Sequence, residues 1–241
     1  MPDNHIYFLE DFEMKEKYIK VCGGIKPEVA KGNGITELVF IIDCSGSMEG
    51  LEEDTIGGFN SALKEQRAKR TRVYVSTILF SNCSKVVHDR VEINKVKAMT
   101  KKDYKVGGCT ALLDAIGDAI HHIANIHKYA RPEDVPEHTI FIITTDGYEN
   151  ASHRYSSQEI KKKIQKQTEK YGWEFLFAAA NIDAVETAKN IGIRENRAAN
   201  YSHNSRGVGN FFSSMNKAIT HIEENYDDFY FADFIPNEEE N

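Results

Sequence analysis

The sequence has no long apolar run, no excess of basic residues and no metal-type spacing of cysteines. No stretch approaches the ~20 apolar residues of a transmembrane helix, so we expect no membrane-embedded segment. The 37 acidic residues outnumber the 30 basic ones, for a net charge of −7. Nucleic-acid binders are normally basic, so we expect no nucleic-acid partner. The cysteines at positions 22, 44, 83 and 109 are expected to be free thiols.

The negative charge is concentrated near the C-terminus. From Ile222 onward there are eight acidic residues and no Lys or Arg, which leaves the rest of the chain near neutral. The first residues, MPDNHIYFLEDFEMKEK, carry acids where a signal peptide would be basic. We therefore expect a cytoplasmic protein with three parts, which are an N-terminal extension (1–34), a main domain (35–224) and an acidic-aromatic tail (225–241).

Apolar runs alternate with amphipathic segments through the main domain. The runs predict strands, and the periodicity of three to four residues predicts helices. The predicted strands are 36–43, 72–80, 85–93, 138–146, 173–180 and 197–202, and the predicted helices are 50–68, 110–128, 157–172, 183–192 and 207–224. This alternation is typical of an α/β fold with a doubly wound, mostly parallel sheet, helices on both faces and one antiparallel edge strand.

Oxygen-bearing side chains follow three of these segments on the same side of the predicted sheet. Asp43, Ser45 and Ser47 follow the first strand, and Asp146 ends the fourth. Thr110, after a pair of glycines, opens a helix that its hydroxyl is also expected to cap. In such sheets, ligands bind outside the carboxyl ends of the strands, so we expect these five side chains to meet there.

Two carboxylates and three hydroxyls are a set of hard oxygen donors. Such a set suits Mg²⁺, with Mn²⁺ or Ca²⁺ as alternatives. Because the set has few carboxylates, a bound cation would keep an open position. An Asp or Glu of a protein partner could fill that position, and this binding mechanism requires no bond breaking.

The motif resembles the metal-ion-dependent adhesion site (MIDAS) of von Willebrand factor A-like (vWA) domains. The family pattern is Asp-x-Ser-x-Ser, then a distant Thr, then a distant Asp, and DCSGS (43–47), Thr110 and Asp146 match it in order. The resemblance covers roughly residues 36–224. It implies six strands in the order 3-2-1-4-5-6 and a Mg²⁺-dependent protein-binding module without catalytic residues. The chain looks most similar to intracellular, stand-alone members of prokaryotic type, some of which work with AAA+ ATPases.

Four residues after Asp146 are expected to line the rim and contact a partner. These are Tyr148, Glu149, Asn150 and Arg154.

Two other functions compete with the binding module. One is a Mg²⁺-dependent phosphohydrolase with Asp43 as nucleophile, because aspartyl-phosphate enzymes place an aspartate after the first strand. However, Ser45 stands where the haloacid-dehalogenase pattern needs a second acid, and the sequence has neither a GxSxG nor a GxxxxGK[ST] motif. The other is a scaffold subunit in which the metal only stabilises the fold.

Overall fold

The computed structural model describes residues 33–69, 72–225 and 228–236. The predicted N-terminal extension (1–34) therefore lies outside the described residues except for its last two positions, as does the NEEEN end of the tail.

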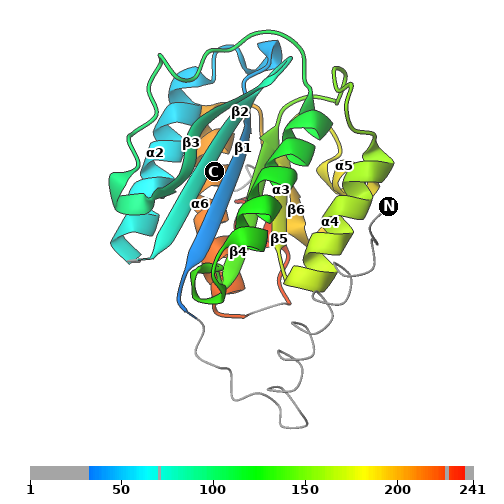
Figure 1. The fold of residues 1–241 in the computed structure, drawn as a ribbon. Coiled ribbons are helices and arrows are strands. Elements are labelled where there is room, and N and C mark those ends of the chain that lie inside the picture. The colour runs from blue at the N-terminus through cyan, green and yellow to red at the C-terminus, as the bar shows by residue number, and fades with distance from the viewer. Residues whose placement is uncertain (1–32, 70–71, 226–227, 237–241) are drawn as a thin grey trace. The chain divides into compact units, whose positions relative to one another are not determined.

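A six-stranded sheet forms the centre of the domain, in the order β3-β2-β1-β4-β5-β6 (Figure 1). Four of the neighbouring pairs are parallel, and β2 pairs with β3 in the antiparallel direction. Both the strand order and the antiparallel edge confirm the prediction. The strands are β1 (Thr36–Asp43), β2 (Val73–Phe80), β3 (Ser84–Glu92), β4 (His138–Thr145), β5 (Glu174–Ala179) and β6 (Ala198–Asn200).

Helices cover both faces of the sheet (Figure 1). Every residue of β1 is buried, and its alternate side chains enter two separate apolar cores. One core joins Phe40 to the face covered by α2 and α6, and the other joins Ile41 to the face covered by α3, α4 and α5. The helices are α2 (Glu52–Lys69), α3 (Leu112–Tyr129), α4 (Ser157–Tyr171), α5 (Ala184–Asn190) and α6 (Ser205–Glu223).

Local signals in the sequence explain where several helices begin and end. Ser156 and Glu159 form a reciprocal capping box at the start of α4, and Gly172 ends that helix in the left-handed conformation (φ 67°). Within α2, a side chain at Gly58 would meet the ring of Phe212 in α6 at 2.3 Å. Glycine at this position therefore lets α2 and α6 approach closely.

The described part of the acidic-aromatic tail packs on the domain. Phe229 and Phe231 are buried in the core on the α2 and α6 face. The hydroxyl of Ser214 in α6 donates a hydrogen bond of 2.5 Å to the carbonyl of Phe234. The guanidinium of Arg197 stacks on the Phe229 ring at 3.9 Å and donates to the Phe229 carbonyl at 2.9 Å. The tail thus contributes to the core through its rings.

In the part of the chain that the structure describes, no helix combines the length and the apolarity that a membrane crossing requires.

Candidate functional site

The end of β1 carries the first three residues of the candidate site. Asp43 is the last residue of the strand and is fully buried. The backbone N–H of Ser45 donates to Oδ1 of Asp43 at 2.7 Å, which turns the chain sharply after the strand. The hydroxyls of Ser45 and Ser47 lie 3.1 Å apart. All three side chains therefore face one small space.

Two hydroxyl groups link the end of β4 to the end of β1 through hydrogen bonds. Thr145 donates a hydrogen bond of 2.6 Å to Oδ2 of Asp43. Ser47 donates one of 2.6 Å to Oδ1 of Asp146. Because β1 and β4 are parallel neighbours, residues separated by about a hundred positions in the sequence meet here.

Thr110 completes the group from the loop before α3. A side chain on Gly147 would lie 3.6 Å from Oγ of Ser47 and 3.8 Å from Oγ1 of Thr110, so both hydroxyls border the space beside Gly147. The structure thus brings together the five predicted residues, which we call the rim oxygen cluster (Asp43, Ser45, Ser47, Thr110 and Asp146).

Thr110 does not cap α3, and that expectation was wrong. The helix begins at Leu112 after Ala111, which makes no side-chain cap. Instead, Glu149 accepts a hydrogen bond of 2.9 Å from the N–H of Leu113, and Ser152 accepts one of 3.0 Å from the next N–H. Because a distant loop supplies the cap, the Thr110 hydroxyl remains directed to the cluster.

The two carboxylates of the cluster are buried, but no Lys or Arg of the described residues pairs with them. Burial raises the pKa of Asp43 above its ordinary value, against hydrogen bonds from Thr145 and Ser45, and the neighbouring Asp146 adds to the rise. Asp146 is also buried, at 2% exposure. Within the described ranges, no Lys or Arg forms an ion pair with either carboxylate. Buried carboxylates without a Lys or Arg partner are costly to keep charged.

The donor set fits a hard divalent cation. All five side chains offer oxygen, and two are carboxylates, as Mg²⁺, Mn²⁺ and Ca²⁺ prefer. Among residues 33–69, 72–225 and 228–236, no group of three or more His, Cys, Asp or Glu side chains could hold a metal ion, at the rim or elsewhere. A cation at the rim would therefore depend on the three hydroxyls as well as on Asp43 and Asp146.

The four predicted partner-contact residues have different surroundings. Tyr148 is 69% exposed and projects from the rim. In contrast, Glu149 accepts hydrogen bonds from the N–H groups of Ala151 and Leu113, and Asn150 accepts one from the N–H of Thr110 at 2.8 Å. Glu149 and Asn150 thus hold the rim loop against α3.

Arg154 lies farther along the same loop. Its guanidinium makes two hydrogen bonds to Asp118, at 2.8 and 2.6 Å, and one longer contact of 3.4 Å to Asp114. Its side chain remains 55% exposed. Of the four residues, Tyr148, Asn150 and Arg154 are therefore exposed, whereas Glu149 is half-buried.

Comparisons with known proteins agree on the fold. No family model matches the sequence, and no curated protein is significantly similar to it. The PilB minor pilin of Streptococcus sanguinis superposes with a TM-score of 0.54 and 12% identity over 81% of this chain. The von Willebrand factor domain of the type V pili tip protein Mfa5 from Porphyromonas gingivalis gives a TM-score of 0.55 and 10% identity over 77% of this chain and 95% of that domain. A von Willebrand factor type A protein of Catenulispora acidiphila gives 0.51 and 13% over 76%.

The fold is that of a vWA domain. The chain spans 63% of the PilB pilin and 42% of the Catenulispora protein, so their other regions have no counterpart here. Two of these structural neighbours are pilus proteins. The cytoplasmic location therefore stays a prediction.

One residue at this rim of the sheet was missed by the sequence analysis. Nε2 of His203 lies 3.0 Å from Oδ2 of Asp146 and 3.1 Å from the carbonyl oxygen of Ser47. No motif spacing signals it, because its partners lie 57 and 156 positions away in the sequence. The available signal was its place after the sixth predicted strand, at the carboxyl rim.

Proposed function

We propose that this vWA domain is a divalent-cation-dependent protein-binding module. The observation that carries the proposal is the pair of buried carboxylates, Asp43 and Asp146, which share a space with three hydroxyls and no Lys or Arg partner among the described residues. A bound cation would neutralise this charge. Mg²⁺ is the cation that we propose, with Mn²⁺ or Ca²⁺ as substitutes.

The five residues of the rim oxygen cluster would hold the cation. When bound, it would supply an acceptor position for a carboxylate from outside the chain. We propose that an Asp or Glu of a protein partner provides this carboxylate, and that the exposed Tyr148 and Arg154 contact the partner around it. Aromatic and Arg side chains are enriched in such interfaces.

Binding is favoured over phosphoester hydrolysis by the surroundings of Asp43. A nucleophilic carboxylate must reach the substrate with a free oxygen. Asp43 has no exposed surface, and its two oxygens accept hydrogen bonds from the Ser45 N–H and the Thr145 hydroxyl. These bonds suit a residue that stays in place and shapes a binding site.

The test combines cation binding with affinity capture. Isothermal titration calorimetry with MgCl₂ is expected to show one site in the wild type and none in Asp43→Ala. Capture of partner proteins from source extract is expected in Mg²⁺ and not in EDTA. Asp89→Ala, which removes an exposed carboxylate from β3, is the matched control and should behave as the wild type.

Other outcomes separate the competing functions. If capture persists in EDTA and in Asp43→Ala, the cation-bridge proposal is wrong. If chelation lowers the melting temperature but leaves capture intact, the cation is structural, as in a scaffold subunit. Hydrolysis of p-nitrophenyl phosphate with Mg²⁺ that is lost in Asp43→Asn would indicate the phosphohydrolase instead.

A further inference from the structure

The turn between β6 and α6 presents His203 in a fixed position. Asn204 is the N-cap of α6, and its side chain accepts a hydrogen bond of 2.7 Å from the N–H of Gly207. Any side chain at Gly207 would meet the carbonyl oxygen of Ser202 at 1.9 Å, so only glycine allows this turn. Ser205 then ties the first turn of α6 to Asp54 in α2, through a hydrogen bond of 2.6 Å. The imidazole therefore projects from a well-anchored segment.

The hydrogen-bond partners of His203 determine the role of its Nε2. The carboxylate oxygen of Asp146 and the backbone carbonyl of Ser47 are both acceptors. Neither can donate, so Nε2 carries the hydrogen and is shared between them. One N–H group thereby joins the loops that follow β1, β4 and β6, because each loop supplies one of the three residues.

The two oxygens of Asp146 have different partners. Oδ1 accepts from the Ser47 hydroxyl, which belongs to the rim oxygen cluster, and Oδ2 accepts from His203. The imidazole thus holds the oxygen that is turned away from the Ser47 hydroxyl. A cation on the cluster side would leave this hydrogen bond intact.

We propose that His203 is a positioning residue of the candidate cation site. Its Nε2–H fixes the orientation of the Asp146 carboxylate and the distance between the Asp146 and Ser47 loops. This inference rests on the proposed function. Carboxylates that bind metals are commonly held by such outer hydrogen bonds, and loss of the outer partner typically costs about 10–100-fold in metal affinity.

Three variants test this role in the full chain. His203→Ala removes the donor and is expected to weaken Mg²⁺ binding by about 10–100-fold in calorimetry. His203→Gln places an amide N–H at nearly the reach of Nε2 and is expected to restore affinity close to that of the wild type. His121→Ala, which removes an exposed histidine from α3, is the control and should change nothing. Melting temperatures in EDTA should agree among all four proteins.

Each alternative outcome is decisive. Equal Mg²⁺ affinity in wild type and His203→Ala would overturn the positioning role and leave the cation site standing, whereas no binding in the wild type would overturn both. A loss of affinity that accompanies a lower melting temperature in EDTA and is not rescued by Gln would assign His203 to folding alone.

Pulsed EPR of the Mn²⁺-loaded protein should show no directly bound imidazole nitrogen, and such a nitrogen would make His203 a ligand instead.

Discussion

The two ends of the sheet differ in the side chains that surround their buried carboxylates. At the amino end, Glu37 has no exposed surface and pairs with two basic side chains, Nε of Arg90 at 3.1 Å and Nε2 of His127 at 2.6 Å. At the carboxyl end, Asp43 is equally buried and has Asp146 beside it, with hydroxyls as neighbours of both and His203 against the outer oxygen of Asp146. Among the described residues, an Arg pairs with the buried carboxylate at the first end, whereas neither Lys nor Arg pairs with Asp43 or Asp146 at the second.

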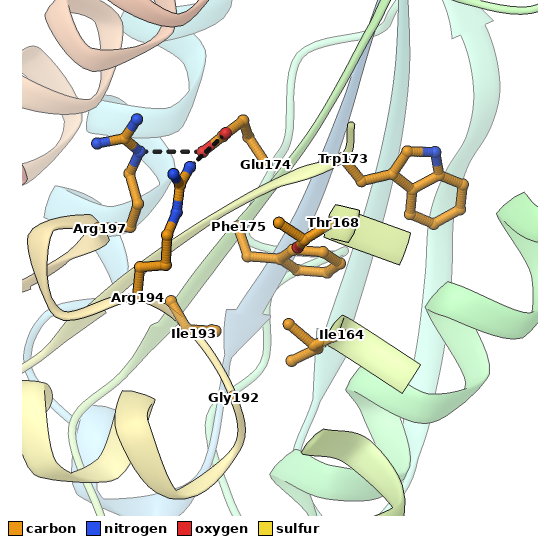
Figure 2. Close-up of a pocket in the computed structure, with 9 residues that line it drawn as sticks. All are labelled: Ile164, Thr168, Trp173, Glu174, Phe175, Gly192, Ile193, Arg194 and Arg197. Carbon is orange, nitrogen blue, oxygen red and sulfur yellow. Dashed lines mark hydrogen bonds and ion pairs between the residues drawn. The ribbon is translucent and has the colours of Figure 1, made fainter. Parts of the chain in front are cut away.

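The start of β5 repeats the arrangement of the amino end. Glu174 accepts hydrogen bonds from Arg194 at 2.5 Å and from Arg197 at 2.9 Å, as Figure 2 shows. These three residues border a small pocket between α4, β5 and the segment before β6, together with Ile164, Thr168, Trp173, Phe175, Gly192 and Ile193. Acids with built-in cations serve stability, whereas the carboxyl end, where neither Asp43 nor Asp146 has a Lys or Arg partner among the described residues, is the part of the molecule that we propose binds a cation.

The largest effect on stability is expected when Glu37, the buried acid at the amino end of the sheet, is replaced. Glu37→Ala leaves the Arg90 guanidinium and His127 without their carboxylate in a buried setting. We expect the free energy of unfolding to fall by about 3–5 kcal/mol, measured by urea denaturation. Glu92→Ala is the control, since Glu92 makes an exposed pair with Lys95 and its loss should leave the free energy of unfolding nearly unchanged. Equal effects of the two variants would contradict the contrast between the ends.

An intermediate effect is expected at Asp43, and it depends on the cation. In EDTA, Asp43→Asn removes a buried charge that has no cationic partner, so the free energy of unfolding should change by less than about 1 kcal/mol or increase. When Mg²⁺ is present at one hundred times its dissociation constant, the wild type should gain about 2.7 kcal/mol and the variant nothing. Chemical denaturation in the two buffers measures both. If Asp43→Asn lowered the free energy of unfolding by several kcal/mol in EDTA, the charge of Asp43 would stabilise the fold without a cation, as the charge of Glu37 does.

The smallest effect is expected at Asp114, an acid near the carboxyl end of the sheet whose carboxylate does have hydrogen-bond donors and an Arg beside it. Partial burial would raise its pKa, but the backbone N–H groups of residues 153–155 and the Arg154 guanidinium outweigh burial and hold the pKa below its ordinary value of 3.8. A lowered pKa in the folded state stabilises the protein above pH 3.8, and this contribution is lost as the pH falls through the folded value.

Asp114→Asn should therefore cost about 1–2 kcal/mol at pH 7 and progressively less below pH 4. Urea denaturation between pH 2.5 and 7 measures the difference. A constant difference over this range would show that the charge of Asp114 is not what anchors the 153–155 loop. The expected pH dependence would show that at least one acid near this rim is stabilised by its own hydrogen bonds and ion pair.

Much of the fold and of the cluster could be predicted from the sequence. The first strand was predicted at its exact bounds, because eight residues buried on both faces form a continuous apolar run. The rim oxygen cluster was predicted because the ends of parallel strands meet at one edge, so Asp43 and Asp146 must be neighbours.

The remaining parts depend on contacts that leave no local pattern. The cap of α3 comes from Glu149 and Ser152, which lie more than thirty positions from the N–H groups they accept. The interpretation of Glu149 and Asn150 as partner contacts used their place in the sequence, and it could not show that Glu149 is half-buried and accepts the N–H of Leu113, or that Asn150, though exposed, accepts the N–H of Thr110. Likewise, the pairing of Glu37 with Arg90 joins β1 to the far edge strand, and neither residue type indicates burial on its own.

The packing of Phe229 and Phe231 has a practical consequence for anyone who shortens this protein. The last helix, α6, ends at Glu223, so the sequence suggests this residue as the place to shorten the chain. Truncation there would strip two rings from the interior and leave the Arg197 side chain without the aromatic surface on which it lies. Shortened chains that end at Glu223 are therefore expected to aggregate, whatever the state of the proposed cation site at the opposite rim.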